Sequence, residues 1–82
     1  MVLGFSEQDP DRAEKEAMLR ALNEADLLAL YHETRRAASG AREAHDMEAL
    51  YPLARGLKTI QRIAGERGLV IRAQRRVKVS DP

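Results

Sequence analysis

Residues 24–67, EADLLALYHETRRAASGAREAHDMEALYPLARGLKTIQRIAGER, decide the fold. In each half of this stretch, apolar or small residues recur at spacings of three and four, which places them on one face of a helix. The stripe of the first half comprises Leu27, Tyr31, Thr34, Ala38 and Ala41. The stripe of the second half comprises Leu50, Leu53, Leu57, Ile60 and Ala64. We therefore predict two helices, at about 24–44 and 47–67, joined by a tight turn at His45-Asp46.

The two stripes are complementary in size when the chain folds back antiparallel at this turn. Small residues then face large ones in most of the pairs, with Ala38 opposite Leu53 and Thr34 opposite Leu57. Such pairs fill a core without voids. The sequence thus predicts an antiparallel helical hairpin. Leu57 lies mid-stripe, so its replacement by Ala is expected to cost roughly 2–5 kcal/mol of stability, as for buried leucines generally.

A short helix is predicted before the hairpin, at about 10–22. Asp9-Pro10 is a helix-start signal, and Asn23 is a break that can cap the next helix. Its expected apolar face comprises Met18, Ala21, Leu22 and Ala25. Residues 1–8 carry no such signal and are expected to be irregular and flexible. Pro52 favours either a kink in the last helix or a regular start nearer Leu50.

The period changes after Gly68. From 69 to 79 most odd positions are apolar and most even positions are polar or basic, which indicates a half-buried extended or β segment. A strand needs a ladder partner. Residues 2–5 are the only local candidate, and the alternatives are the same strand of a second copy or the sheet edge of another protein. Ile71, Val77 and Val79 would then lie at the dimer or partner contact. The other interpretation is a basic tail extended in solution; residues 80–82 are expected to be flexible.

Length and composition limit the number of domains, the chemistry and the cell compartment that the chain can have. With 82 residues and no cysteine, the chain is predicted to be a single small, mainly α domain spanning 1–82, without disulfide or thiolate chemistry. No apolar run approaches the ~20 residues that cross a bilayer. The first residues do not follow a signal-peptide pattern either. We expect a cytoplasmic protein without membrane association.

Charge is distributed unevenly along the chain. Residues 1–26 hold seven acids and three bases, a net charge of −4, whereas residues 52–82 hold two acids and eight bases, a net charge of +6. The candidate basic face consists of Arg55, Lys58, Arg62, Arg72, Arg75, Arg76 and Lys78. These side chains could contact nucleic-acid phosphates. Alternatively, they pair with the acids Glu14, Glu16 and Glu24.

No catalytic constellation stands out. His32 lies beside the apolar stripe, and His45 has only Glu48 at a spacing that suits a shared metal, whereas zinc sites take three or four ligands. Glu43 and Asp46 lie near the predicted turn, where burial would not separate their pKa values. We expect no enzyme activity, no metal and no cofactor.

Binding is therefore the expected function. One hairpin stripe cannot cover all of the large apolar residues Leu19, Leu28, Leu30 and Tyr31. The favoured interpretation is a non-catalytic protein–protein interaction module, of adaptor or inhibitor type, that docks on a larger protein or forms a homodimer. The alternative is a small nucleic-acid-binding protein that uses the last helix and the basic C-terminal segment.

Overall fold

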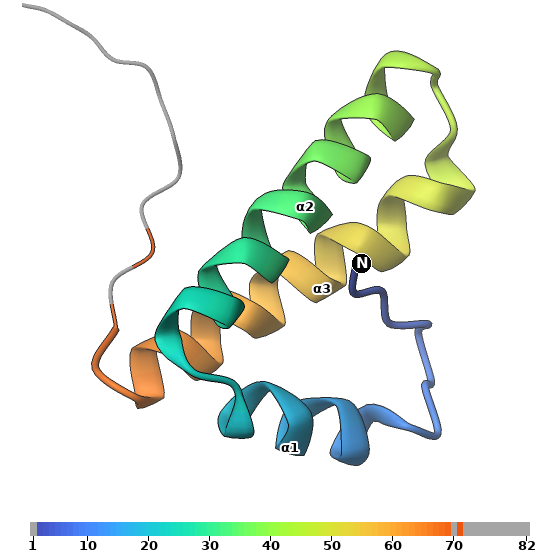
Figure 1. The fold of residues 1–82 in the computed structure, drawn as a ribbon. Coiled ribbons are helices and arrows are strands. Elements are labelled where there is room, and N and C mark those ends of the chain that lie inside the picture. Colours follow the sequence, from blue (N-terminus) through green and yellow to red (C-terminus); the bar gives the residue numbers. More distant parts are fainter. Residues whose placement is uncertain (1, 70, 72–82) are drawn as a thin grey trace, which may run out of the picture.

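The structure, a computed structural model, describes residues 2–69 and 71. It contains helices α1 (Arg12–Ala21), α2 (Glu24–Glu43) and α3 (Met47–Glu66), and the described residues include no strand. Helices α2 and α3 lie side by side and antiparallel, and α1 lies across one end of this hairpin (Figure 1). The prediction of a mainly helical chain is confirmed. Of the predicted extended segment, only Leu69 and Ile71 are among the described residues.

Side-chain caps set the starts of the two long helices. The Asn23 side chain accepts a hydrogen bond from the N–H of Asp26 at 2.7 Å. The Asp46 side chain accepts one from the N–H of Ala49 at 3.2 Å. Each bond satisfies an N–H that has no partner within the helix. The predicted break at Asn23 is confirmed, and α3 begins before Pro52 without a later start near Leu50.

A residue in the left-handed backbone conformation follows each of the same two helices and ends it. His45 follows α2 with a φ of 57°, and Gly68 follows α3 with a φ of 77°. The N–H of Leu69 donates to the carbonyl of Ala64 at 2.8 Å, which closes the last turn of α3. Glycine adopts this conformation without strain. The predicted turn at 45–46 and the predicted stop at Gly68 are both confirmed.

The N-terminal segment, residues 2–5, packs into the helices. It has no regular secondary structure, as expected, yet Leu3 and Phe5 are 6% and 0% exposed. The N–H of Leu3 donates to Thr34 Oγ1 at 3.0 Å, and the N–H of Phe5 donates to the carbonyl of Pro52 at 3.1 Å. These N–H groups are engaged by α2 and α3; the predicted strand partner of residues 2–5 lies almost wholly outside the described residues.

Gly56 allows this packing. A Cβ atom at position 56 would overlap the carbonyl oxygen of Leu3. The backbone of the N-terminal segment therefore passes directly over α3 where the helix has no side chain. Only glycine permits so close an approach of two backbones.

The face of α3 that is buried in the core differs from the predicted face and is rotated about the helix axis. The buried cluster comprises Leu3, Phe5, Leu19, Leu27, Leu30, Tyr31, Ile60, Ile63 and Ala64. Leu50, Leu53 and Leu57 of the predicted stripe are only partly buried, whereas Ile63, outside it, is fully buried. The reason is that α3 contacts both α2 and α1, and thus buries a wider face than a two-helix hairpin requires.

The face of α1 also differs from the prediction. Leu19, which the sequence analysis left uncovered, is fully buried. Met18 and Leu22 are partly buried, and Ala21 and Ala25 are exposed. Leu19 enters the core because α1 packs on α3.

The observed buried face of α3 predicts how much stability is lost when Ile63 or Leu57 is replaced by alanine. We expect Ile63→Ala to lower the free energy of unfolding by about 2–5 kcal/mol, as for fully buried aliphatic residues. Leu57→Ala should cost clearly less, because part of its side chain already contacts water. Urea unfolding followed by circular dichroism measures both. Equal losses would contradict the rotated core.

Replacing Gly56 tests the close approach. Gly56→Ala should destabilise the chain by about 1–3 kcal/mol, the usual cost of overpacking, because the Leu3 backbone must move away. Gly65→Ala is the matched control. A Cβ there meets no other atom within 4 Å, so higher helix propensity should stabilise the chain by about 0.5–1 kcal/mol. A neutral Gly56→Ala would show that residues 2–5 do not hold this position.

Candidate functional site

An apolar groove lies between α1 and α2. Its volume is about 290 Å³, and its lining consists of Met18, Leu22, Asp26, Ala29, Leu30 and Glu33. Leu30 forms the buried floor, and Met18 and Leu22 are half-buried walls contributed by α1. Ala29 is exposed and, lacking a long side chain, leaves space above the floor. We call this feature the elbow groove.

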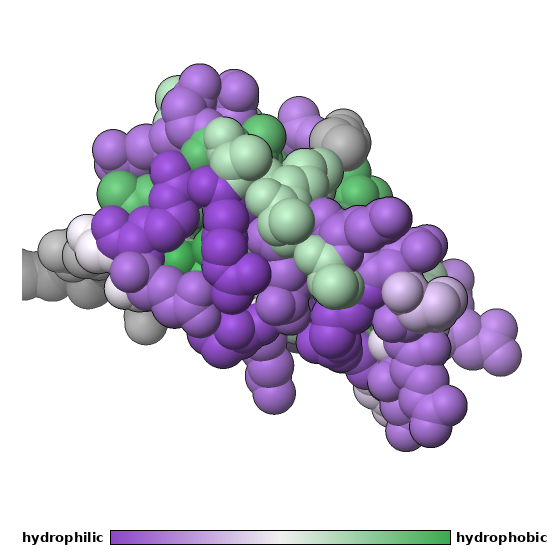
Figure 2. Space-filling model, turned by 90° about the horizontal axis from the view of Figure 1, so that it is seen from below, coloured by the Kyte–Doolittle hydropathy of each residue, from purple (hydrophilic) through white to green (hydrophobic). Residues whose placement is uncertain are grey.

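The groove follows from how α1 is placed. The chain turns at Asn23, and α1 then packs on α3 rather than along α2. The two helices therefore diverge and leave the hollow between them. The face that carries α1 is hydrophilic over most of its area, with a band of apolar side chains crossing it (Figure 2). An exposed apolar hollow on a polar surface is typical of binding sites.

Acidic side chains edge the elbow groove. Asp26 and Glu33 belong to its lining, and both come from α2. The N-terminal third, which supplies Met18 and Leu22, has a net charge of −4. Carboxylates beside an apolar hollow favour a ligand that combines apolar groups with positive charge. The groove is thus suited to a basic, apolar peptide segment.

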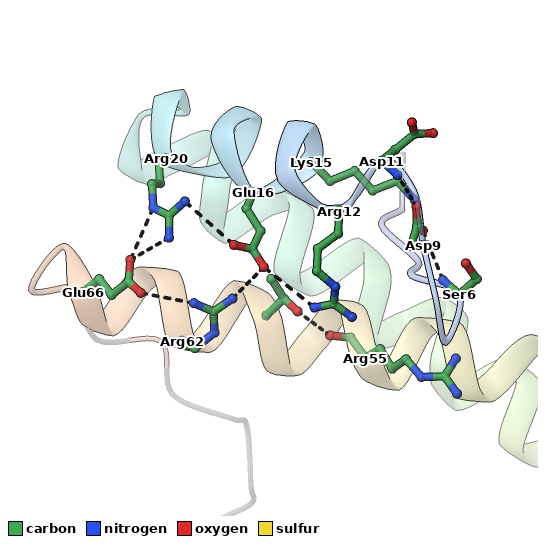
Figure 3. Close-up of polar contacts among 11 residues, drawn as sticks. Ser6, Asp9, Asp11, Arg12, Lys15, Glu16, Arg20, Arg55, Arg62 and Glu66 are labelled. Carbon is green, nitrogen blue, oxygen red and sulfur yellow. Dashed lines mark hydrogen bonds and ion pairs between the residues drawn. The ribbon is translucent and has the colours of Figure 1, made fainter.

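A cluster of ion pairs fastens α1 to α3 (Figure 3). Glu16 accepts from Arg62 at 2.7 Å, and Glu66 accepts from Arg20 at 3.1 Å and from Arg62 at 3.2 Å. Arg67 donates to the carbonyl of Leu19 at 3.1 Å, at the end of α1. Exposed pairs contribute little individually, but a network fixes geometry. Here it holds the α1 wall of the elbow groove in place.

This cluster also uses part of the predicted basic face. Arg62 is paired with Glu16 and Glu66, and Arg55 donates to the carbonyl of Phe5 at 3.1 Å. Of the three predicted cations on α3, Arg55 is partly buried, whereas Lys58 and the paired Arg62 are exposed. Pairing with Glu16 was one of the two alternatives left open. Arg72, Arg75, Arg76 and Lys78 lie outside the described residues, as do Val77 and Val79.

The predicted docking residues have a different location from that expected. Leu19, Leu30 and Tyr31 are buried within the chain, and only Leu28 is exposed, at 39%. The expectation failed because the N-terminal segment and α1 enlarge the core beyond the hairpin. Ile71, predicted at a dimer contact, packs against the chain's own core and lines a small hollow with Glu24, Leu27, Leu28 and Leu69.

Sequence reasoning missed the elbow groove itself. Met18 and Leu22 were assigned to an apolar face of the first helix, and that pattern was the only available signal. Ala29 carried none, because an alanine in a helix is unremarkable. The groove results from the direction in which α1 leaves Asn23, which periodicity does not specify.

A second polar cluster secures the N-terminal segment. Asp9 accepts hydrogen bonds from Lys15 Nζ at 2.7 Å and from the N–H groups of Asp11 and Ser6 at 2.8 and 3.1 Å. Lys15 also donates to the carbonyl of Gly4 at 2.9 Å. These bonds, that of Lys15 first, lower the pKa of Asp9 to about 2. The cluster thereby ties the start of α1 to the buried segment.

The described residues contain neither a metal-binding cluster nor a membrane-spanning helix. Within 2–69 and 71, no three His, Asp or Glu side chains come together as metal ligands do. In the same part of the chain, no helix has the length and apolar character that crossing a membrane requires. Comparisons with family models, curated proteins and solved structures found no match.

The Asp9 cluster predicts a pH dependence. A carboxyl pKa of about 2 in the folded chain, against about 4 when unfolded, stabilises the fold above pH 4. That contribution should disappear as the pH falls from about 4 to about 2. We expect the urea midpoint to decrease more steeply over this range in the wild type than in Asp9→Asn. Parallel decreases would contradict the assignment, and a carboxyl titration by NMR locates the midpoint directly.

Proposed function

We propose that the chain is a non-catalytic binding module that takes up a short basic and apolar peptide segment of another protein in the elbow groove. The observation that carries this proposal is the combination of an open apolar hollow with the acidic Asp26 in its lining; Glu33, also in the lining, is already engaged within the chain. Exposure of apolar surface to water costs about 25 cal/mol per Å². A segment that covers Met18 and Leu22 would recover part of that cost.

The rigidity of the groove supports the proposal. Its α1 wall is held on α3 by the buried Leu19 and by the pairs of Glu16 and Glu66. Its α2 wall belongs to the core through Leu30. A preformed site loses little conformational entropy on binding. Such a module would act by blocking or recruiting the protein that supplies the segment.

Nucleic-acid binding ranks second. Arg55 and Arg62 are engaged within the chain, and a cation that is already paired offers less to a phosphate. That alternative therefore depends on Lys58 and on the four cations at 72–78. Peptide binding, by contrast, would use a groove whose lining belongs entirely to the described residues.

A matched pair of lysine substitutions tests the proposal. We expect a displayed random-peptide library, selected on the wild-type chain, to yield segments that combine apolar residues with Lys or Arg. Ala29→Lys places a charged chain in the groove and should weaken these peptides at least tenfold, measured by calorimetry. Ala17→Lys makes the same change at an exposed position outside the lining and should leave their affinity unchanged.

Two results would overturn the proposal. One is a selection that yields no binding peptide. The other is a set of peptides that bind Ala29→Lys and the wild type equally, which would place their site elsewhere. Both positions are exposed and helical, so both variants should remain folded. Circular dichroism checks this before binding is measured.

A further inference from the structure

We propose that residues 72–82 of the same chain occupy the elbow groove and compete with its partner. This inference rests on the proposed function, because it names an internal ligand for the same groove. The groove is apolar with acidic edges, and residues 72–82 are apolar and basic. Charge, exit point and length support this choice of occupant independently.

Charge complementarity is the first support. Residues 72–82 contain four bases, Arg72, Arg75, Arg76 and Lys78, and one acid, which gives a net charge of +3. Val77 and Val79 are separated by one residue, so an extended backbone projects both to one side. That side would meet Met18, Leu22 and Leu30, while the cations would lie near Asp26.

The exit point is the second support. Ile71 lines a small hollow with Glu24, Leu27 and Leu28, at the first turns of α2. The elbow groove begins at Asp26, on the opposite side of the same turns, so the segment would have to pass around α2 to reach it. The chain therefore leaves the described structure beside the helix that carries the groove.

The length of the segment is the third support. Eleven extended residues reach about 36 Å at roughly 3.3 Å each. Passing around half of α2, whose diameter with side chains is about 10–12 Å, requires roughly 16–19 Å. The groove from Asp26 to Glu33 then takes about 10 Å, at roughly 1.5 Å per helical residue. Residues 72–76 suffice for this path at roughly 3.3 Å each, which brings residues 77–79 to the groove.

A second copy of the chain could supply the same residues. The connection from Ile71 favours the same chain, because a tethered segment of this length has an effective concentration in the millimolar range. A free second copy reaches such values only in concentrated solution. Binding within one chain would lower the apparent affinity for a partner and make it dependent on displacing the segment.

Aspartates in the full-length chain test the inference. Val77→Asp with Val79→Asp removes the two apolar anchors, whereas Gln74→Asp with Ser80→Asp makes the same charge change at polar positions. We expect the first variant alone to shift the amide NMR signals of Leu22, Ala29 and Leu30. It should also bind library-selected groove peptides at least tenfold more tightly than the wild type does.

A synthetic peptide of residues 72–82 completes the test. Added to the Val77→Asp, Val79→Asp chain, it should restore the wild-type amide signals, whereas the peptide with aspartate at both valine positions should not. Unchanged groove signals in that chain would overturn the inference. So would a wild-type dimer by light scattering that dissociates on the same substitutions, because the occupant would then come from a second copy. If selected peptides bind the groove but the 72–82 peptide does not, the inference fails and the proposed function stands.

Discussion

The fold depends on the contact between the backbone of residues 3–5 and the helices. Two N–H groups and two carbonyls of this short segment are satisfied by Thr34, Pro52, Lys15 and Arg55. Phe5 lies fully buried beneath the cations of Arg12 and Lys15, each 5.1 Å from its ring centre. Because α1 follows directly, this contact also determines on which side of the hairpin α1 packs.

Pro52 and Gly56 therefore have a different role from the one that their helix propensities suggest. In isolation, both residues weaken a helix. In α3 they lie four residues apart, which places them on one face, and that face receives the N-terminal segment. The carbonyl of Pro52 accepts the N–H of Phe5, and the absent side chain of Gly56 makes room for Leu3. The loss of helix stability at these two positions is offset by the tertiary contacts that they allow.

The sequence specifies the helices better than their arrangement. Asn23, Asp46 and Gly68 predicted the helix limits, because caps and left-handed stops are local features. The burial of Leu3, Phe5 and Leu19 was not predictable in the same way, because it results from contacts between residues far apart in the chain. The elbow groove depends on the arrangement of the helices. Its apolar residues can be identified in the sequence, but their proximity on either side of Asn23 cannot.

The buried N-terminal segment has a consequence for synthesis on the ribosome. Leu3 and Phe5 are translated well before their partners, since Thr34 follows Leu3 by 31 residues and Arg55 follows Phe5 by 50. The segment thus stays without its partners until most of α3 has been translated. Contacts over such sequence separations form late in folding, because the entropy of loop closure opposes them until other contacts are in place.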